Sequence, residues 1–280
     1  MKSLKKFSGV ILADFAKIFR MKSFYIGIAV MVFITILFAV AENALSSLVE
    51  SYPAEGQPVD TDAVTALFSF SLLNAAPSST MAFILVAIIT GLAVGTDFSS
   101  GMTRVFVGRG MRKYELYLSK LLVISVVSVI YVCLSFAMCS AAARAICESQ
   151  STFDSLACYT PAAFGAYIFL AIVLSAINTS VCFAVRSKAG SIAALFAMFI
   201  ILGDILVLVV QIALGVAVNG ENSAAGYVYL LLDPYYLPDA LSTVRIFTSK
   251  ELGLVFGGGA MWTVLFTAGG LLLNEKRDVK

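Results

Sequence analysis

Six long apolar stretches, each close to the length of a membrane span, dominate the pattern of hydrophobic and polar positions along this chain. A hydrocarbon core about 30 Å thick needs about 20 apolar helical residues to cross it. The pattern therefore predicts an all-α integral membrane protein with six transmembrane helices in a single domain, residues 1–280. The stretches that qualify cover residues 23–41, 79–95, 121–143, 162–185, 189–209 and 254–273.

The positions of lysine and arginine predict which loops face the cytoplasm, because carrying these residues across the bilayer is costly. None occurs from Ser23 to Thr103, and five then fall between Arg104 and Lys120. With the N-terminus inside, the inner segments hold sixteen of the nineteen basic residues. The composition agrees, since 60% of the residues are hydrophobic and only 13% are charged. We therefore expect a multi-pass protein with both termini cytoplasmic and no nucleic-acid partner.

Residues 1–22 have a helical periodicity of their own. An apolar stripe recurs at steps of three and four residues, with the charged side chains mainly off it. This pattern is typical of an amphipathic interfacial helix on the inner leaflet, either a topological anchor or a helix that transmits motion. A cleaved signal peptide is disfavoured, because its apolar core of about 7 to 15 residues would be shorter. The stripe comprises Leu4, Phe7, Ile11, Phe15 and Ile18, and the charged residues are Lys5, Lys6, Asp14 and Lys17.

The outer segment between the last two predicted spans, residues 210–253, is longer than a simple turn. It begins with a largely apolar stretch and continues with four tyrosines around Asp233 and Pro234. Tyrosine favours the headgroup region of a bilayer. Backbone at membrane depth must also remain hydrogen-bonded. We therefore expect this segment to be helical or re-entrant.

The chemistry that the chain lacks narrows its function. It contains no histidine, which excludes histidine general bases and HExxH metal sites. Its five cysteines include no CxxC pair, so no zinc site is expected. No P-loop sequence is present either, so any ATP-driven work requires a second protein. Cys147 and Cys158 share one predicted outer loop, where a disulfide is possible but its geometry is left open.

Asp204 is the one acidic residue deep within a predicted span. An ionisable group buried in a membrane is a candidate for a translocation path. However, the apolar run from 189 to 218 is longer than one span needs. Asp204 can therefore also lie near an outer cavity and hydrogen-bond a neighbouring helix, and both interpretations remain open.

The segment between the second and third predicted spans, residues 96–120, has the most specific pattern in the chain. Its three glycines let the backbone turn, and Ser99 or Ser100 can cap a short helix. Its basic residues can meet carboxylates on a soluble partner or anionic lipid headgroups. The glycines are Gly101, Gly108 and Gly110, and the basic residues are Arg104, Arg109, Arg112, Lys113 and Lys120.

Five residues of this segment come in a distinctive order: an acid, a glycine, a base, an arginine and then a lysine that opens the third span. They are Asp97, Gly101, Arg104, Arg112 and Lys120. This order resembles the first cytoplasmic loop of ABC-2 type transporter permeases, with Asp97 where glutamate is more usual. The amphipathic start, the six spans, the long outer segment and the charged ending at 274–277 extend the resemblance over essentially the whole chain.

The resemblance implies the membrane subunit of an ATP-driven ABC exporter, located in a bacterial plasma membrane. Two separate ATPase subunits would bind ATP and Mg²⁺ and act on two permease chains, identical or related. The chain itself would then be no enzyme and would bind no cofactor or metal. Antimicrobial peptides or other amphipathic molecules are the expected substrates. The residues that would couple to the ATPase are Asp97, Phe98, Gly101, Arg104, Arg109, Arg112 and Lys113.

Two other functions remain compatible with the sequence. One is an ion-coupled secondary transporter that uses Asp204. The other is a non-transporting membrane scaffold or immunity protein. Stimulation of ATP hydrolysis in a co-purified ATPase would separate both from an ABC exporter.

Overall fold

The computed structural model describes residues 2–51, 80–146, 160–200 and 249–276, and its regular structure within these ranges is entirely helical. A helix satisfies its backbone hydrogen bonds internally, as a lipid environment requires. The all-α prediction is thus confirmed for the described part of the chain. The helices are α1 (Lys2–Arg20), α2 (Lys22–Ser51), α4 (Thr80–Ser99), α5 (Met102–Gly108), α6 (Lys113–Ile146), α8 (Thr160–Val185), α9 (Lys188–Ile200) and α13 (Ser249–Lys276).

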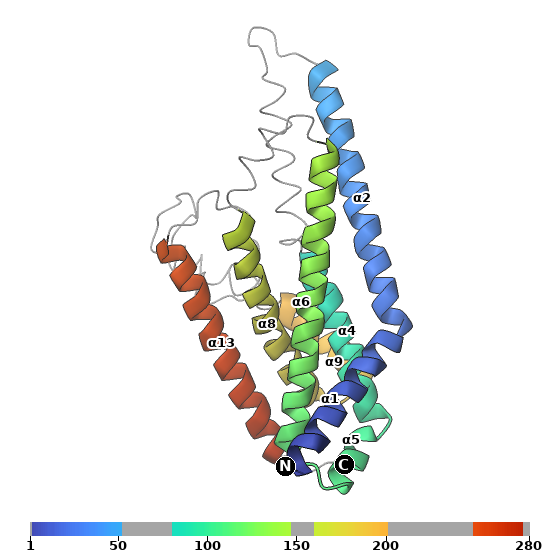
Figure 1. Ribbon diagram of the computed structural model, residues 1–280, viewed down its shortest axis with the longest axis vertical. Helices are drawn as coiled ribbons and strands as arrows, with labels where there is room; N and C mark the ends of the chain where they lie inside the picture. Colours follow the sequence, from blue (N-terminus) through green and yellow to red (C-terminus); the bar gives the residue numbers. More distant parts are fainter. Residues whose placement is uncertain (1, 52–79, 147–159, 201–248, 277–280) are drawn as a thin grey trace.

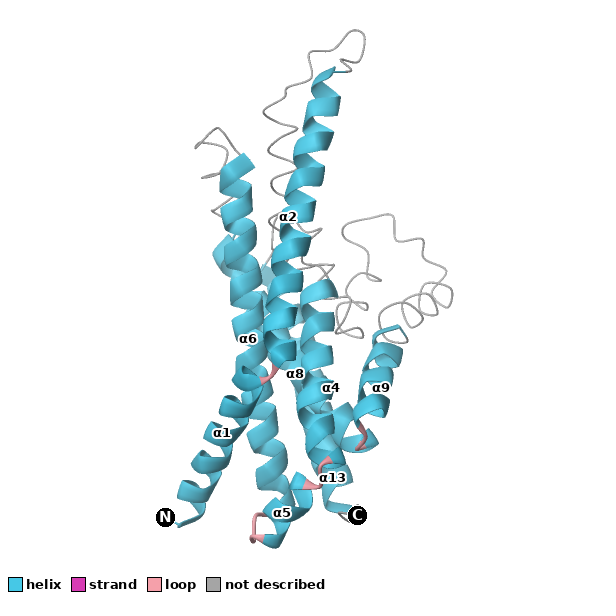
Figure 2. Cartoon of the chain, turned by 90° about the vertical axis from the view of Figure 1, so that its right-hand side faces the viewer, coloured by secondary structure: helices cyan, strands magenta, loops and turns pink. Residues whose placement is uncertain are grey.

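The longer helices run roughly along the long axis of an elongated bundle (Figure 1). In this view α13 and α2 lie on opposite sides, with α8 and α6 between them. One end of the bundle holds the start of α1, the end of α13 and the short helix α5. Figure 2 shows this end from a second side. We call this the α5 end of the bundle.

Three helices, α6, α8 and α13, are each long and apolar enough to cross a membrane. Two bent pairs raise the number of candidate spans to as many as five: α1 with α2, at 56°, and α4 with α5, at 63°. The chain is therefore a multi-pass membrane protein. The predicted span 189–209 begins as α9, but its residues beyond Ile200 lie outside the described part of the chain, as do residues 210–248 of the outer segment.

Some helices extend beyond the predicted spans. α2 continues to Ser51, and α6 begins at Lys113 rather than at residue 121. The early start of α6 has a packing reason, because Leu116 and Tyr117 are buried in its first two turns. Lys120 is buried there as well and pairs with two carboxylates. The lysine that marked the start of the predicted span therefore lies within α6 and not at its beginning.

α8 occupies the centre of the bundle and packs against α4, α6, α9 and α13. Apolar side chains along it, such as Leu170 and Ile177, are fully buried. A short chain of hydrogen bonds also crosses the bundle at this helix. The hydroxyl groups of Tyr117 in α6 and Ser180 in α8 lie 2.8 Å apart, and Ser180 donates to the Phe266 carbonyl of α13 at 2.8 Å. These hydrogen bonds therefore hold three helices together and pair the buried hydroxyl groups of Tyr117 and Ser180.

α13 comes close to α6 because Gly270 has no side chain at the contact. A Cβ atom added there would lie 2.7–2.9 Å from three atoms of Tyr117, among them two ring carbons. Tyr117 is fully buried, and its ring packs edge-on against Phe183 with the centroids 5.0 Å apart. The tyrosine thus has little room to move aside.

Replacing Gly270 with alanine is expected to lower the free energy of unfolding by about 1–3 kcal/mol, the usual cost of overpacking a filled site. Thermal unfolding of the purified protein in detergent would measure the loss. Gly269→Ala on the same helix is the matched control, because nothing lies within 4 Å of a Cβ added there. Equal midpoints for the two variants would contradict the close packing of Tyr117 against α13.

Candidate functional site: the elbow between α4 and α6

The chain between α4 and α6 forms an elbow, residues 100–112, around the short helix α5. The backbone turns at Gly101 and at Gly110, where φ is 71° and 81°. Glycine adopts this left-handed conformation without steric cost, so the turns predicted at these two positions are confirmed. Gly108 instead lies in the last turn of α5. The elbow protrudes at the α5 end of the bundle (Figure 2).

The start of α5 differs from the sequence prediction. Gly101 occupies the N-cap position, and no side chain caps the helix. Ser99 Oγ instead donates to the Thr96 carbonyl at 3.1 Å, and Ser100 Oγ donates to the Asp97 carbonyl at 3.5 Å. A serine hydroxyl readily bonds to a carbonyl three or four residues before it. Both serines therefore close the last turn of α4 rather than cap α5.

Four charged side chains meet behind the elbow, where α1, α4 and α6 come together. The Asp97 carboxylate of α4 accepts hydrogen bonds from Lys17 of α1 and from Lys120 of α6. Lys120 also donates to Asp14 of α1, at 2.5 Å. The charges alternate in sign and sum to zero. We call Asp14, Lys17, Asp97 and Lys120 the charge cluster.

The charge cluster is largely shielded from solvent. Asp14, Asp97 and Lys120 are only 5%, 4% and 6% exposed, whereas the Lys17 side chain is 31% exposed. Burial of an ion is unfavourable unless it is paired and hydrogen-bonded. The alternating contacts supply this pairing for both lysines and for Asp97. Asp14 Oδ2, however, has no hydrogen-bond partner among the described residues.

Lys17 also closes the end of α4. Its ammonium donates to the Ala93 carbonyl at 3.3 Å and to Thr96 Oγ1 at 3.2 Å. A cation near the last carbonyls of a helix interacts favourably with the helix dipole. A small cavity of about 10 Å³ adjoins this contact and is lined by Lys17, Asp14 and Lys120 together with apolar side chains. Its size suits one water molecule.

The outer face of the elbow is exposed and carries three arginines. Arg104, Arg109 and Arg112 project from a surface that also exposes the apolar side chains of Met102 and Val105. Arginine forms strong paired hydrogen bonds with carboxylate and phosphate groups. This face can therefore bind an acidic protein surface or anionic headgroups, with apolar contacts between the charged ones.

Arg112 also helps to start α6. Its backbone N–H donates to Glu115 Oε2 at 3.2 Å, the reciprocal contact of a helix capping box. Its guanidinium donates to the Tyr114 hydroxyl at 3.2 Å, and this hydrogen bond raises the pKa of Arg112. Arg112 thus keeps its charge at any physiological pH.

The elbow is tied to the ends of α8 and α13 as well. The Phe98 ring packs edge-on against Phe183 with the centroids 5.2 Å apart, and the Arg186 guanidinium lies 5.9 Å from the Phe98 centroid. Asn274 Oδ1 accepts a hydrogen bond from Arg186 at 3.4 Å, and Asn274 Nδ2 donates to the Lys113 carbonyl at 2.9 Å. Four helices, α4, α6, α8 and α13, thus converge on the base of the elbow.

Of the seven predicted coupling residues, Gly101 forms the N-cap of α5, the Lys113 ammonium donates to the Glu275 carbonyl at 3.3 Å, and the other five fall into two groups. Asp97 is buried in the charge cluster, and Phe98 packs inward, whereas the three arginines point outward from the elbow. Sequence reasoning missed that Lys17 and Asp14 of α1 pair with Asp97 and Lys120, which lie on either side of the elbow. A signal was available, because charges within or beside apolar stretches are usually paired.

The remaining predicted site residues lie outside the described residues. They are Asp204, Cys147 and Cys158, so the translocation role and the disulfide stay predictions. Within the described ranges, Cys133 and Cys182 are free thiols. No group of three or more histidine, cysteine or acidic side chains in these ranges could hold a metal ion.

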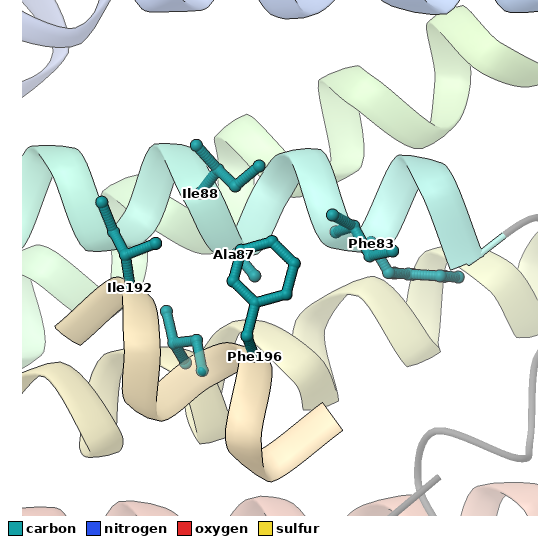
Figure 3. Close-up of a pocket in the computed structure, with 7 residues that line it drawn as sticks. Phe83, Ala87, Ile88, Ile192 and Phe196 are labelled. Atoms are coloured by element: carbon teal, nitrogen blue, oxygen red, sulfur yellow. The ribbon is translucent and has the colours of Figure 1, made fainter. Parts of the chain in front are cut away.

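A second small cavity lies between α4 and α9 (Figure 3). Phe83, Ala87 and Ile88 line it from α4, and Ile192 and Phe196 line it from α9. Every residue around this cavity is apolar, and its volume is about 10 Å³. It therefore offers no polar group that could orient a substrate, and the elbow remains the candidate site.

Comparisons with known proteins assign no family to this arrangement. No protein-family model matches the chain, and a search of curated proteins finds no match to it. The assignment to a membrane protein thus rests on the length and apolar composition of the helices. The described residues show a multi-pass helical protein with an exposed, basic elbow at the α5 end.

Proposed function

We propose that this chain is the membrane subunit of an ATP-driven exporter, and that its elbow receives the motion of a separate ATPase subunit. The observation that carries the proposal is the construction of the elbow. An exposed elbow that carries Arg104, Arg109 and Arg112 is joined at its base to a buried charge cluster and to the ends of four helices. The resemblance of residues 96–120 to the first cytoplasmic loop of ABC-2 permeases supports the same function.

A surface that transmits force must be accessible to its partner and fixed to the part that moves. Arg104 and Arg109 meet the first requirement, because both side chains are exposed on the elbow. Asp97 and Lys120 meet the second, because they pair the two helices on either side of it. A displacement of α5 would therefore be passed to α4 and α6 together, as in the rigid-body motions of many transporters.

The partner that suits this surface presents carboxylates around an apolar patch. Two or three arginine–carboxylate pairs would fix its orientation, and Met102 and Val105 would be buried between them. Anionic lipid headgroups could pair with the same arginines. The protein partner is favoured because the arginines follow the acid and the glycine in the order of the ABC-2 loop.

The rest of the assembly follows from the same resemblance. Two ATPase subunits bind ATP and Mg²⁺, and a second permease chain completes the path for the substrate. α1 lies at the inner membrane interface with both termini in the cytoplasm of a bacterial cell. Antimicrobial peptides or other amphipathic molecules are the substrate class that we propose.

The experiment that tests this function is purification of the full-length tagged chain from its native membranes in mild detergent. A photoreactive ATP analogue should label a co-eluting subunit, and amphipathic peptides should stimulate vanadate-sensitive ATP hydrolysis in the eluate. Absence of a labelled subunit, together with peptide transport that an ion gradient alone can drive, would overturn the proposal. That outcome would favour the ion-coupled carrier.

A further inference from the structure

α1 is held against the bundle by charge as well as by apolar contact. Ile11, Phe15 and Ile18 pack on the hydrophobic core near the α5 end. Asp14 lies between them on the same face, three or four residues from each of Ile11 and Ile18, and is buried with them. The face that docks α1 therefore includes a buried ion, which a purely hydrophobic contact would exclude.

The charge cluster is complementary between two parts of the chain. α1 supplies one acid and one base, Asp14 and Lys17, and the α4–α6 pair supplies Asp97 and Lys120. Asp97 and Lys120 pair with each other, and each also pairs with the opposite charge of α1. We call Lys17 with Asp97 and Asp14 with Lys120 the cross pairs. Removal of α1 would leave the buried charges of Asp97 and Lys120 each without one of their two ion-pair partners.

We propose that the charge cluster is an electrostatic latch: the two cross pairs hold α1 docked on α4 and α6, and breaking them releases α1 from the bundle. Opening would begin at Asp14, because its Oδ2 has no hydrogen-bond partner among the described residues and Asp14 lines the cavity of about 10 Å³, where water can solvate it. Once released, the apolar stripe of α1 would lie on the membrane surface.

Release of α1 has a consequence for α2. Only Met21 separates the two helices, which meet at 56°. With α1 docked, this bend is fixed by contacts on α4 and α6. With α1 free, α2 can change its direction relative to the bundle. The latch concerns this chain alone and goes beyond the proposed coupling to an ATPase, so its test requires no partner.

Charge exchange provides the test, because it preserves the composition and net charge of the chain. Exchanging the charges of α1 in Asp14→Lys/Lys17→Asp makes both cross pairs repulsive. Exchanging the charges of α4 and α6 in Asp97→Lys/Lys120→Asp also makes both cross pairs repulsive. It keeps the attraction between positions 97 and 120. Combining all four substitutions makes every pair attractive again.

The position of α1 would be measured as a distance between two spin labels by electron paramagnetic resonance in lipid nanodiscs. The labels are placed on cysteines at Ala16 of α1 and Val126 of α6, both exposed, after replacement of the native cysteines by alanine. A second labelled pair, Val126 with Ile172 of α8, reports on the bundle without α1. This second pair should give the same distance in every variant.

Each double exchange should raise the ratio of released to docked α1 about a hundredfold or more, because like charges brought together cost several kcal/mol. The fourfold exchange should restore the docked distance. Docked distances in both double exchanges would overturn the latch. So would a fourfold variant with an intact bundle whose α1 stays released.

A milder variant covers the case in which the double exchanges fail to fold. Lys17→Gln breaks one cross pair at the most exposed member of the cluster, so the bundle should tolerate it. The released-to-docked ratio should rise about fivefold, as expected for a partly exposed pair worth up to about 1 kcal/mol. An unchanged ratio in this variant would also contradict the latch.

Discussion

Replacing Lys120 with methionine is expected to lower the free energy of unfolding by about 3–5 kcal/mol, because removing one partner strands buried charge. Lys120 is the only described partner of Asp14, and it shares Asp97 with Lys17. Methionine fills a similar volume but supplies neither charge nor hydrogen-bond donor. Thermal unfolding and titration with a denaturing detergent would measure the loss in the purified protein.

Two controls separate the loss of charge from the change of shape. Lys188→Met removes an exposed lysine at the same end of the bundle, and its unfolding midpoint should stay close to that of the parent protein. Adding Asp14→Leu to Lys120→Met should recover much of the lost stability, because the stranded carboxylate is gone while Asp97 keeps Lys17. A Lys120→Met variant as stable as Lys188→Met would contradict the buried cluster.

The amphipathic pattern of residues 1–22 predicted the helix α1 but not its neighbours. Ile11, Phe15 and Ile18 form the predicted stripe, and in the structure they pack on other helices. Periodicity identifies which residues share a face of a helix, but it does not tell whether that face meets lipid or protein. Asp14 is buried beside its partner Lys120, which lies 106 residues away in the chain. The pattern within residues 1–22 cannot predict a contact with so distant a residue.

The elbow and the helices beside it show the same contrast: the backbone turns could be predicted from the sequence, but the contacts between distant residues could not. The turns at Gly101 and Gly110 could be predicted, because a glycine permits a backbone conformation that other residues avoid. The sequence also singled out Asp97 as a candidate residue, but it did not predict that this carboxylate is buried. Its partners Lys17 and Lys120 lie 80 and 23 residues away, and only the packing of α1 brings the three together.

Reversing the charge of Arg104 and Arg109 to glutamate is expected to abolish association with the proposed ATPase subunit or the stimulation of its hydrolysis by substrate. Both side chains are exposed on the elbow, so the substitutions should leave the fold intact. At an interface with carboxylates, losing a desolvated, hydrogen-bonded charge pair costs about 2–5 kcal/mol. Like charges brought together there would weaken binding further. Co-purification of the ATPase and substrate-stimulated hydrolysis in the same membranes measure the two effects.

Membrane insertion should survive the reversal, because Arg112, Lys113 and Lys120 remain to keep the elbow on the proposed cytoplasmic side. Reversal of Lys188 and Lys276 is the matched control, since both are exposed at the α5 end but lie on α9 and α13. If lipid headgroups were the partner, both double reversals would weaken the binding of anionic lipid to the detergent-purified protein alike, and ATP hydrolysis would be unaffected. Normal co-purification and hydrolysis with the Arg104 and Arg109 reversal would show that these arginines serve topology alone, and the elbow would lose its role as a coupler.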